Sequence, residues 1–311
     1  MPPSLEAVGL SKRFGSFAAV SDLNLKVQGT KCVGFLGPNG AGKTTTMKIF
    51  TGLLSATSGN ALVNGVDIRK DKKGALASCT SLIETPEIYP SLTPKEALTM
   101  LCEIRGVPHA ERNPRIDEAL GRVKMTEWAD KKVGSFSKGM KQRINVASTL
   151  LSDPEVIILD EPSTGLDPRG MSEVRDIVKS LGDRLVFMSS HLLAEVTEVC
   201  QEVALIDHGK LLVYDTIANV SDKFSGGGGA VLVGFSHPIG AEVRSNIEAM
   251  EGVLGVSATN ERQLQIRFDP KATTLETLFG KVAGLRAGAT SFGEAASGLE
   301  DAYLSLIKET L

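Results

Sequence analysis

The chain has 311 residues, of which 42% are hydrophobic, so it is long enough for one large domain and one small domain. Its 34 Lys and Arg residues nearly balance its 37 Asp and Glu residues, which argues against a nucleic-acid binder or a polybasic membrane-surface protein. No run approaches the roughly 18 to 20 apolar residues of a membrane helix, and the N-terminus predicts no signal peptide. The four cysteines show no metal-ligand spacing, so we expect reduced core thiols at Cys32, Cys79, Cys102 and Cys200.

Short apolar runs alternate with helical patterns up to residue 220. The runs at 31–36, 156–159, 185–189 and 203–206 have the character of buried strands, which predicts a covered, mostly parallel sheet. Residues 86–151 show helical periodicity without a good strand, so we predict a helical subdomain inserted into this domain. The first domain is therefore predicted to be of the α/β class and to span residues 1–220.

Four successive glycines within residues 225–229 predict a flexible break, and we place a linker at 221–229. Beyond it, the patterns follow the order βαββαβ, with segments at 230–235, 241–250, 254–259, 264–268, 275–285 and 289–292. This order predicts a small α+β domain of ferredoxin-like type over residues 230–311. A last amphipathic segment, 298–311, is expected to dock onto a core through Leu299, Ala302, Tyr303 and Leu306.

Residues 37–45, GPNGAGKTT, directly follow a predicted strand and precede a helical run. They match the phosphate-binding pattern GxxxxGK[ST] in its required strand, loop and helix context. The glycines let the backbone approach closely enough for successive N–H groups to point at phosphate oxygens. We expect Lys43 to bridge the β- and γ-phosphates of ATP and the Thr44 hydroxyl to complete the shell of Mg²⁺. The other residues of the loop expected to bind nucleotide are Asn39, Gly40, Ala41, Gly42 and Thr45.

Two carboxylates, Asp160 and Glu161, follow an apolar strand in the segment VIILDEPSTGLDP. An acidic residue at the carboxyl end of a buried strand is where a P-loop enzyme holds its magnesium ion. Asp160 is therefore the expected metal-side carboxylate, and Glu161 is expected to orient and deprotonate the attacking water. Without the phosphate loop, the same pair would also fit a helix N-cap.

The segment SFSKGMKQR, residues 135–143, precedes these carboxylates at the spacing of the ATP-binding-cassette signature. It resembles the LSGGQ-type motif of that family, in a variant known from antibiotic and lantibiotic exporters. Phe136 replaces the family's Leu, Lys138 replaces its first Gly, and Met140 stands at the Gln position. The retained Ser137 and Gly139 are the groups that the resemblance places against a γ-phosphate.

Other motifs of the family follow in order, and the resemblance covers residues 5 to about 220. Residues 164–167 resemble the D-loop, which adds Asp167 to the nucleotide site, and the Ser190-His191 pair resembles the switch histidine. Phe14 matches the aromatic that stacks on adenine, although a core Phe remains an alternative. Glu84 stands where the family usually has Gln, so it becomes a candidate for the nucleotide and metal site, with an unrelated surface Glu as the alternative.

The resemblance implies a P-loop ABC ATPase in which two cassettes face head to tail, each ATP lying between one P-loop and the opposite signature. A single copy of each motif therefore implies a dimer with a second copy or a homologous cassette. The implied activity is ATP hydrolysis that powers export through a separate membrane permease, at the cytoplasmic face, with no nucleic-acid partner. The permease is expected to dock in the groove between Glu84 and the helix starting near Thr93. The alternatives are an importer ATPase, a cassette protein acting on ribosomes or DNA, and a metabolic P-loop kinase.

Overall fold

The computed structural model describes residues 2–84, 86–224 and 229–294. The chain divides into two compact units, Met1–Asp215 and Thr216–Leu311. Helix α8 (Ile217–Phe224) belongs to the second unit and covers residues 221–224, which we had expected in the linker. The helix forms because its apolar residues are spaced so as to share one face, and Val220 on that face is fully buried. The limits of the domains stay a prediction, and the amphipathic segment 298–311 lies outside the described residues.

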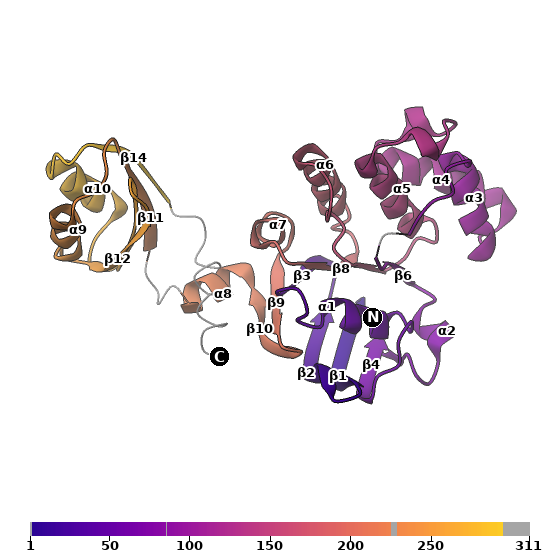
Figure 1. Cartoon of the computed structure of the whole chain (residues 1–311). Helices are drawn as coiled ribbons and strands as arrows, with labels where there is room; N and C mark the ends of the chain where they lie inside the picture. Colours follow the sequence, from indigo (N-terminus) through magenta and orange to yellow (C-terminus); the bar gives the residue numbers. More distant parts are fainter. Residues whose placement is uncertain (1, 85, 225–228, 295–311) are drawn as a thin grey trace. The chain divides into compact units, whose positions relative to one another are not determined.

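The first unit is built on a six-stranded sheet with the strand order β10-β9-β3-β8-β7-β6 (Figure 1). The pairs from β9 through β6 are parallel, and the four strands expected from their apolar runs are all present. Parallel strands buried on both faces carry such continuous apolar runs. The strands are β3 (Lys31–Leu36), β6 (Cys79–Leu82), β7 (Val156–Leu159), β8 (Leu185–Ser190), β9 (Glu202–Asp207) and β10 (Lys210–Thr216).

A second, antiparallel sheet with the order β2-β1-β4-β5 completes the core, and the sequence analysis did not predict it. Its strands are β1 (Ser4–Phe14), β2 (Phe17–Gln28), β4 (Ser58–Val63) and β5 (Val66–Asp67). In the second half of β2, buried and exposed positions alternate, because one face packs on the core and the other meets solvent. Leu23 and Leu25 of β2 pack in one cluster with Phe35 and Phe187 of the parallel sheet. Helices α1 (Lys43–Phe50) and α2 (Lys72–Ala75) accompany this part of the unit.

The predicted helical insertion is present, and Figure 1 shows its main helices grouped together. It comprises α3 (Pro94–Ile104), α4 (His109–Arg122), two 3₁₀ turns (Thr126–Trp128 and Val133–Ser135) and α5 (Lys138–Leu150). Helix α3 begins with a capping box, in which Thr93 and Glu96 each bond the other's backbone N–H. Two more helices, α6 (Pro168–Lys179) and α7 (Leu193–Val199), follow strands β7 and β8.

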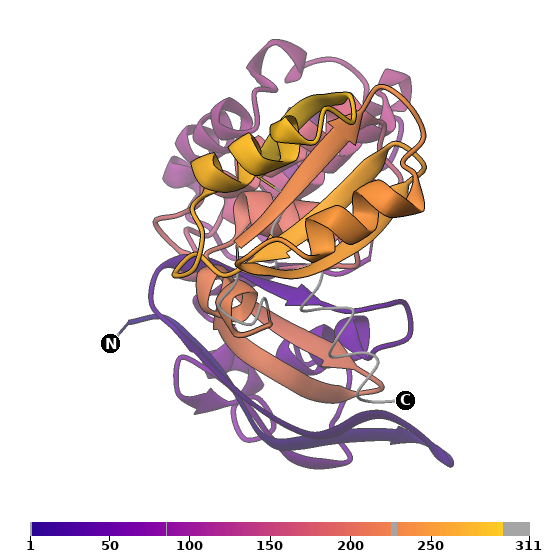
Figure 2. The same ribbon diagram turned by 90° about the vertical axis from the view of Figure 1, so that its left-hand side faces the viewer.

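The second unit contains the predicted βαββαβ succession of elements. Its antiparallel sheet has the order β12-β13-β11-β14, and Figure 2 shows both helices lying across one face of it. This is the ferredoxin-like arrangement. The core between helices and sheet includes Val231, Ile266, Ile247 and Leu278. The elements are β11 (Gly229–Phe235), α9 (Ala241–Glu248), β12 (Val253–Asn260), β13 (Gln263–Phe268), α10 (Leu275–Gly284) and β14 (Ala289–Glu294).

Candidate nucleotide-binding site

The carboxyl ends of the parallel strands bring the predicted site residues to one edge of the sheet. Leu36, the last residue of β3, pairs with Ser190 of β8 and Leu205 of β9. On the other side, the last residues of β6 and β7 pair with each other, Leu82 with Leu159. The loops that leave this edge carry the P-loop, Glu84, the two carboxylates and His191, and ligands bind at this edge in open α/β sheets.

The backbone of the P-loop needs glycine at two positions. A Cβ at Gly37 would lie 2.2 Å from the carbonyl oxygen of Ile206. Gly42 has a φ of +103°, and a Cβ there would lie 2.4 Å from the carbonyl oxygen of Ala19. Gly42 is also the N-cap of α1 and offers no side chain, so the first amides of this helix remain available to an anion. This cradle fits a phosphate group.

Backbone hydrogen bonds tie the P-loop to strands on both sides of it. The amide of Gly209, in the turn between β9 and β10, donates to the carbonyl oxygen of Ala41 at 3.0 Å. The carbonyl oxygen of Gly209 accepts from the amide of Ser21 in β2 at 2.8 Å. The loop is therefore connected through one glycine to the antiparallel sheet.

Lys43, the first residue of α1, is only 5% exposed and lies folded over the loop. Its Nζ donates to the carbonyl oxygens of Gly37 at 2.8 Å and Pro38 at 3.1 Å. The same nitrogen lies 3.3 Å from Oε1 of Glu161. A buried ammonium group held by backbone carbonyls at the mouth of a phosphate cradle is suited to contact phosphate oxygens.

Asp160 is a buried carboxylate directly after β7, held by a residue that the sequence analysis missed. The Ser189 hydroxyl donates to Oδ1 of Asp160 at 2.6 Å, and Ser189 Oγ accepts from the amide of Glu161 at 2.9 Å. The parallel pairing of β7 with β8 brings Ser189 beside these carboxylates. In the sequence, Ser189 could have been recognised as a site residue because it is a polar residue that follows an apolar run near the end of a strand.

The donor set fits Mg²⁺ bound together with a nucleotide. Among the described residues, no three His, Cys, Asp or Glu side chains are placed to hold a metal by themselves. Magnesium is usually held by one or two carboxylates and substrate phosphates, so a single buried Asp160 and the Thr44 hydroxyl are a sufficient protein contribution. Thr44 is the second residue of α1, next to the buried Lys43.

Glu161 accepts hydrogen bonds from two side chains, although its backbone has the uncommon φ of +46°. The Thr164 hydroxyl donates to Oε2 at 2.7 Å, and Nδ1 of His191 lies 2.6 Å from the same oxygen. Partial burial raises the pKa of Glu161, but these two bonds and the charge of Lys43 outweigh it and hold the pKa below its usual value. The structure thus brings three predicted catalytic residues together, Lys43, Glu161 and His191.

Glu84 is paired with a cation that the sequence analysis did not consider. Its Oε1 lies 2.5 Å from Nζ of Lys48, which projects from α1. Glu84 is 68% exposed and has a φ of +60°. The charge of Lys48 offsets that of the carboxylate, so the negative charge of Glu84 is locally balanced.

Phe14 lies next to the hairpin turn between β1 and β2, and its side chain is 50% exposed. Nζ of Lys12 lies 5.0 Å from the ring centroid. A ring this exposed is not a core residue, so the alternative of a core Phe is not met. Its stacking on adenine stays a prediction.

The signature and D-loop residues lie together in a hollow of about 430 Å³. Ser137 caps α5 and accepts from the amide of Met140 at 3.2 Å, and Asp167 caps α6 by accepting from the amide of Gly170 at 3.2 Å. Gly139 lies against the start of α6, where a Cβ would make an ordinary contact with Cα of Gly170 at 3.5 Å. The lining residues are Lys124, Trp128, Ser137, Gly139, Met140, Arg143, Asp167, Arg169, Gly170 and Glu173. None of them belongs to the P-loop, so this hollow is separate from the phosphate cradle.

Fold and site together define a nucleotide-binding protein of the P-loop class, and comparisons with known proteins give its family. A family model described as "ABC transporter" matches residues 20–164. The bacitracin transport ATP-binding protein BcrA of Bacillus licheniformis is 40% identical over 215 residues, covering 68% of this chain and 69% of BcrA. The lantibiotic transport ATP-binding protein SrtF of Streptococcus pyogenes is 34% identical over 228 residues, covering 71% and 96%. A solved structure of the ATP-binding subunit of an ABC transporter superposes with a TM-score of 0.63 at 26% identity, covering 71% and 92%.

This chain belongs to the ATP-binding proteins of the ABC transporter family. The family resemblance and the fold class predicted from the motifs, a P-loop ATPase domain with a helical insertion, are confirmed. Within the described ranges, no helix is both long and apolar enough to span a membrane.

Proposed function

We propose that this chain hydrolyses ATP with Mg²⁺ and that the reaction powers export of a substrate through a separate membrane permease. The observation that carries the proposal is the convergence on Glu161, whose carboxylate contacts His191 at 2.6 Å and Lys43 at 3.3 Å. A base, a phosphate-binding cation and an imidazole meet there beside the phosphate cradle. This combination suits the transfer of a γ-phosphoryl group to water.

Each residue has a defined part in this reaction. Glu161, a carboxylate that is ionised at neutral pH, takes the proton of the water that attacks the γ-phosphorus as the bond to ADP breaks. Lys43 moves from Glu161 to the phosphate oxygens, and His191 donates to the γ-phosphate. Thr44 and Asp160 would hold Mg²⁺, whose charge would balance the charge that develops on the phosphates. Glu84, paired with Lys48, lies on the loop that follows β6 and closes the site from that side.

The second half of each site comes from another cassette in this proposal. The hollow of Ser137, Gly139 and Asp167 has no P-loop residue in its lining, so these side chains are free to meet the ATP of a facing subunit. Lys124, Arg143 and Arg169 line the same hollow together with Glu173, which lies 3.6 Å from Arg143 and 3.1 Å from Arg169. Two copies placed head to tail, or one copy with a homologous cassette, thereby complete two sites.

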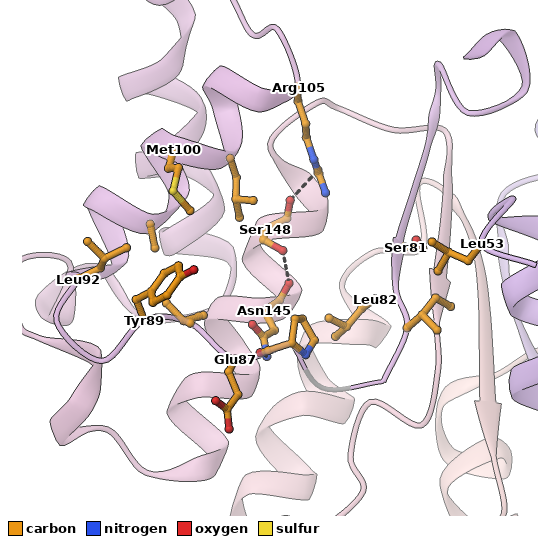
Figure 3. Close-up of a pocket in the computed structure, with 15 residues that line it drawn as sticks. Leu53, Ser81, Leu82, Glu87, Tyr89, Leu92, Met100, Arg105, Asn145 and Ser148 are labelled. Atoms are coloured by element: carbon orange, nitrogen blue, oxygen red, sulfur yellow. Dashed lines mark hydrogen bonds between the residues drawn. The ribbon is translucent and has the colours of Figure 1, made fainter. Parts of the chain in front are cut away.

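The permease docks in a groove of about 330 Å³ between the strand β6 and the helical insertion (Figure 3). Large apolar side chains are exposed around it, with Leu53 at 63%, Tyr89 at 67% and Met100 at 41%. Such side chains at the rim of a groove mark a protein interaction site. The lining includes residues on both sides of Glu84 and residues of α3, which supports the predicted docking between Glu84 and the helix that starts near Thr93. Attachment through it places the chain at the cytoplasmic face of the membrane.

Export rather than import is supported by the signature variant and by relatives named for transport of bacitracin and of a lantibiotic. A third relative is the linearmycin resistance ATP-binding protein LnrL of Bacillus subtilis, and resistance is consistent with removal of a drug from the cell. These names concern transport, which favours a transporter over a cassette protein acting on ribosomes or DNA.

The test is to purify the chain with the membrane protein encoded beside it and to reconstitute both in vesicles. Cassettes facing outward should drive ATP-dependent uptake of labelled bacitracin into inside-out vesicles, and the Glu161→Gln protein should not. ATP-dependent uptake only into right-side-out vesicles would identify an importer. A chain that hydrolyses ATP but binds no membrane protein would overturn the transport proposal.

A further inference from the structure

An arginine at one end of the docking groove has no acidic partner. Arg105 ends α3 and is partly buried, and its Nη1 donates to the carbonyl oxygen of Ser148 at 2.7 Å (Figure 3). Within the described ranges, no carboxylate lies within ion-pair distance of this guanidinium, and the Ser148 carbonyl is its one hydrogen-bond acceptor. Desolvation lowers the pKa of Arg105, although the group remains a cation at neutral pH.

Two neighbouring arginines of the helical insertion, unlike Arg105, each have an acidic partner. Arg112 pairs with Glu103 at 2.7 Å, and Arg115 pairs with Glu111 at 2.6 Å. Arg115 also donates to a backbone carbonyl, that of Leu151, as Arg105 does to Ser148. Both paired arginines lie outside the lining of the groove, whereas Arg105 belongs to it. The arginine that faces the groove is thus the one left without an acid.

The groove carries a cation and a carboxylate on opposite sides. Figure 3 shows Arg105 at the top and Glu87 at the bottom of the labelled side chains, with Ser148 and Asn145 between them and the apolar Met100, Tyr89 and Leu92 to one side. A second hollow, of about 610 Å³, shares Arg105 and Ser81 with the groove. It is lined by Lys72 and Lys73 and by no carboxylate, so the Arg105 end has a positive potential.

A partly desolvated cation gains most from a partner that is charged and planar. A carboxylate accepts two parallel N–H bonds from a guanidinium, which adds energy and also fixes orientation. Charge complementarity of this kind determines partner choice and register more than it determines total affinity. An apolar segment with one acid at the correct end would fill the groove and satisfy Arg105.

We propose that the permease segment that docks in this groove places a Glu or Asp side chain against Arg105, with its apolar face on Tyr89 and Met100. This inference rests on the proposed function, which assigns the groove to the permease. It adds the chemistry of the contact and its direction, with the acidic end of the segment at Arg105 and a neutral or basic end at Glu87. Arg105 is then a specificity residue for the choice of permease.

The experiment compares Arg105→Met with Arg115→Met in the full chain. Methionine keeps the apolar stem of arginine and removes the charge, so each variant loses one positive charge and one bond to a backbone carbonyl, and Arg115→Met also loses the exposed pair with Glu111. Binding is measured to the permease encoded beside this chain, held in nanodiscs of phosphatidylcholine. We expect Arg105→Met to weaken binding about tenfold or more and to flatten its dependence on salt. Arg115→Met should bind within about twofold of the wild type, and both variants should keep the thermal midpoint and ATPase rate of the isolated wild-type chain.

A third variant separates this inference from the proposed function. Met100→Glu places a charge on the apolar lining and should abolish binding if the groove is the docking site. Loss of binding in Met100→Glu with full affinity in Arg105→Met would overturn the Arg105 contact and leave the docking site intact. Absence of binding by the wild-type chain, or full binding by Met100→Glu, would overturn the assignment of the groove itself.

A charge exchange identifies the acid directly. Arg105→Glu should lose binding, and replacing one acidic residue of a cytoplasmic permease loop by Arg should restore it. Failure of every such replacement to restore binding would contradict the proposal. If affinity instead follows the content of phosphatidylglycerol in nanodiscs without permease, a lipid phosphate is the partner of Arg105 and the proposal is wrong.

Discussion

Nδ1 of His191 lies 2.6 Å from Oε2 of Glu161, although the two residues follow different strands of the parallel sheet. The same carboxylate oxygen accepts from Thr164, and the other lies 3.3 Å from Lys43. One carboxylate therefore connects the loops after β3, β7 and β8. Any group that draws Lys43 or His191 away from Glu161 frees that carboxylate to meet a water molecule.

Replacement of Glu161 by Gln should stop hydrolysis while leaving ATP binding in place. Glutamine keeps the size and hydrogen-bonding reach of the side chain but cannot take a proton, so the rate should fall by about two to four orders of magnitude. Phosphate release by the purified variant measures this. A Glu161→Gln protein that hydrolyses ATP at the wild-type rate would contradict the role of Glu161 as base.

The same variant should become a dimer with ATP and a monomer without it, because the closed state is no longer resolved by hydrolysis. Adding Ser137→Arg should abolish this dimer, since a long cation would enter the hollow where Ser137 caps α5. Light scattering during size exclusion, with and without ATP, distinguishes the states. The head-to-tail arrangement is wrong if the double variant still dimerises with ATP.

Lys43→Ala should weaken the binding of ATP with magnesium. The substitution removes a buried cation from the phosphate cradle and two hydrogen bonds to the loop, from Lys43 to Gly37 and Pro38. We expect a loss of about tenfold or more, measured by calorimetry, with Lys70→Ala as a control at an exposed surface lysine. Equal affinities of the two variants would remove the basis for the P-loop assignment.

Glu84→Gln should keep or raise the ATPase rate. It restores the residue that the family usually has and removes a carboxylate whose exposed pair with Lys48 contributes about 1 kcal/mol or less to stability. The rate is measured at several magnesium concentrations, with Lys48→Met as the partner variant. A loss of more than about tenfold in Glu84→Gln, roughly 1.4 kcal/mol of barrier, would show that Glu84 has a role that glutamine cannot supply.

The lowered pKa of Glu161 makes part of the folding stability depend on pH. A carboxylate with a lower pKa in the folded chain contributes stability above its unfolded-state pKa, and the contribution is lost as the pH falls through the folded value. As the pH falls from about 5 through and below the ordinary Glu pKa of about 4.3, urea unfolding of the wild type should therefore lose more stability than that of Glu161→Gln. Parallel pH profiles of the two proteins would mean that the contacts of Glu161 do not stabilise its ionised form.

Two glycines of the P-loop should differ in their tolerance of alanine. Gly40 and Gly42 both have positive φ, so either substitution adds strain of about 1–2 kcal/mol. Only Gly42→Ala also drives a Cβ to 2.4 Å from the carbonyl oxygen of Ala19, whereas the Gly40 position has no atom within 4 Å. Without nucleotide, Gly42→Ala should have the lower thermal midpoint of the two. Equal midpoints would contradict the steric role of Gly42.

The sequence predicted those parts of the fold whose patterns are local. Continuous apolar runs identified the parallel strands β3, β7, β8 and β9 but not β6, in which Thr80 and Ser81 interrupt the apolar pattern. The P-loop and the Asp160-Glu161 pair were recognisable because fixed residue types stand at fixed spacing. The antiparallel sheet was missed because its long strands are half-buried and irregular, with register shifts in β1 between Ala7 and Leu10 and again between Leu10 and Lys12.

The contacts of the candidate site depend on which strands are neighbours, and a single sequence does not contain that information. Ser189 and Asp160 are 29 residues apart, and only the pairing of β7 with β8 makes Ser189 a support for the carboxylate. Lys48 and Glu84, 36 residues apart, meet for a similar reason, since the partner of an exposed carboxylate depends on tertiary packing.

The two backbone hydrogen bonds of Gly209 make hydrogen exchange at a distant strand sensitive to the state of the P-loop. The amide of Gly209 donates to the carbonyl oxygen of Ala41, and its carbonyl oxygen accepts from the amide of Ser21. We therefore expect these two hydrogen bonds to open and close together. A phosphate that stiffens the loop should therefore slow hydrogen exchange at the amides of Gly209 and Ser21, although neither residue belongs to the nucleotide motif. Nucleotide binding to the P-loop can therefore be followed by hydrogen exchange at Ser21, in strand β2 of the antiparallel sheet, without changing any catalytic side chain.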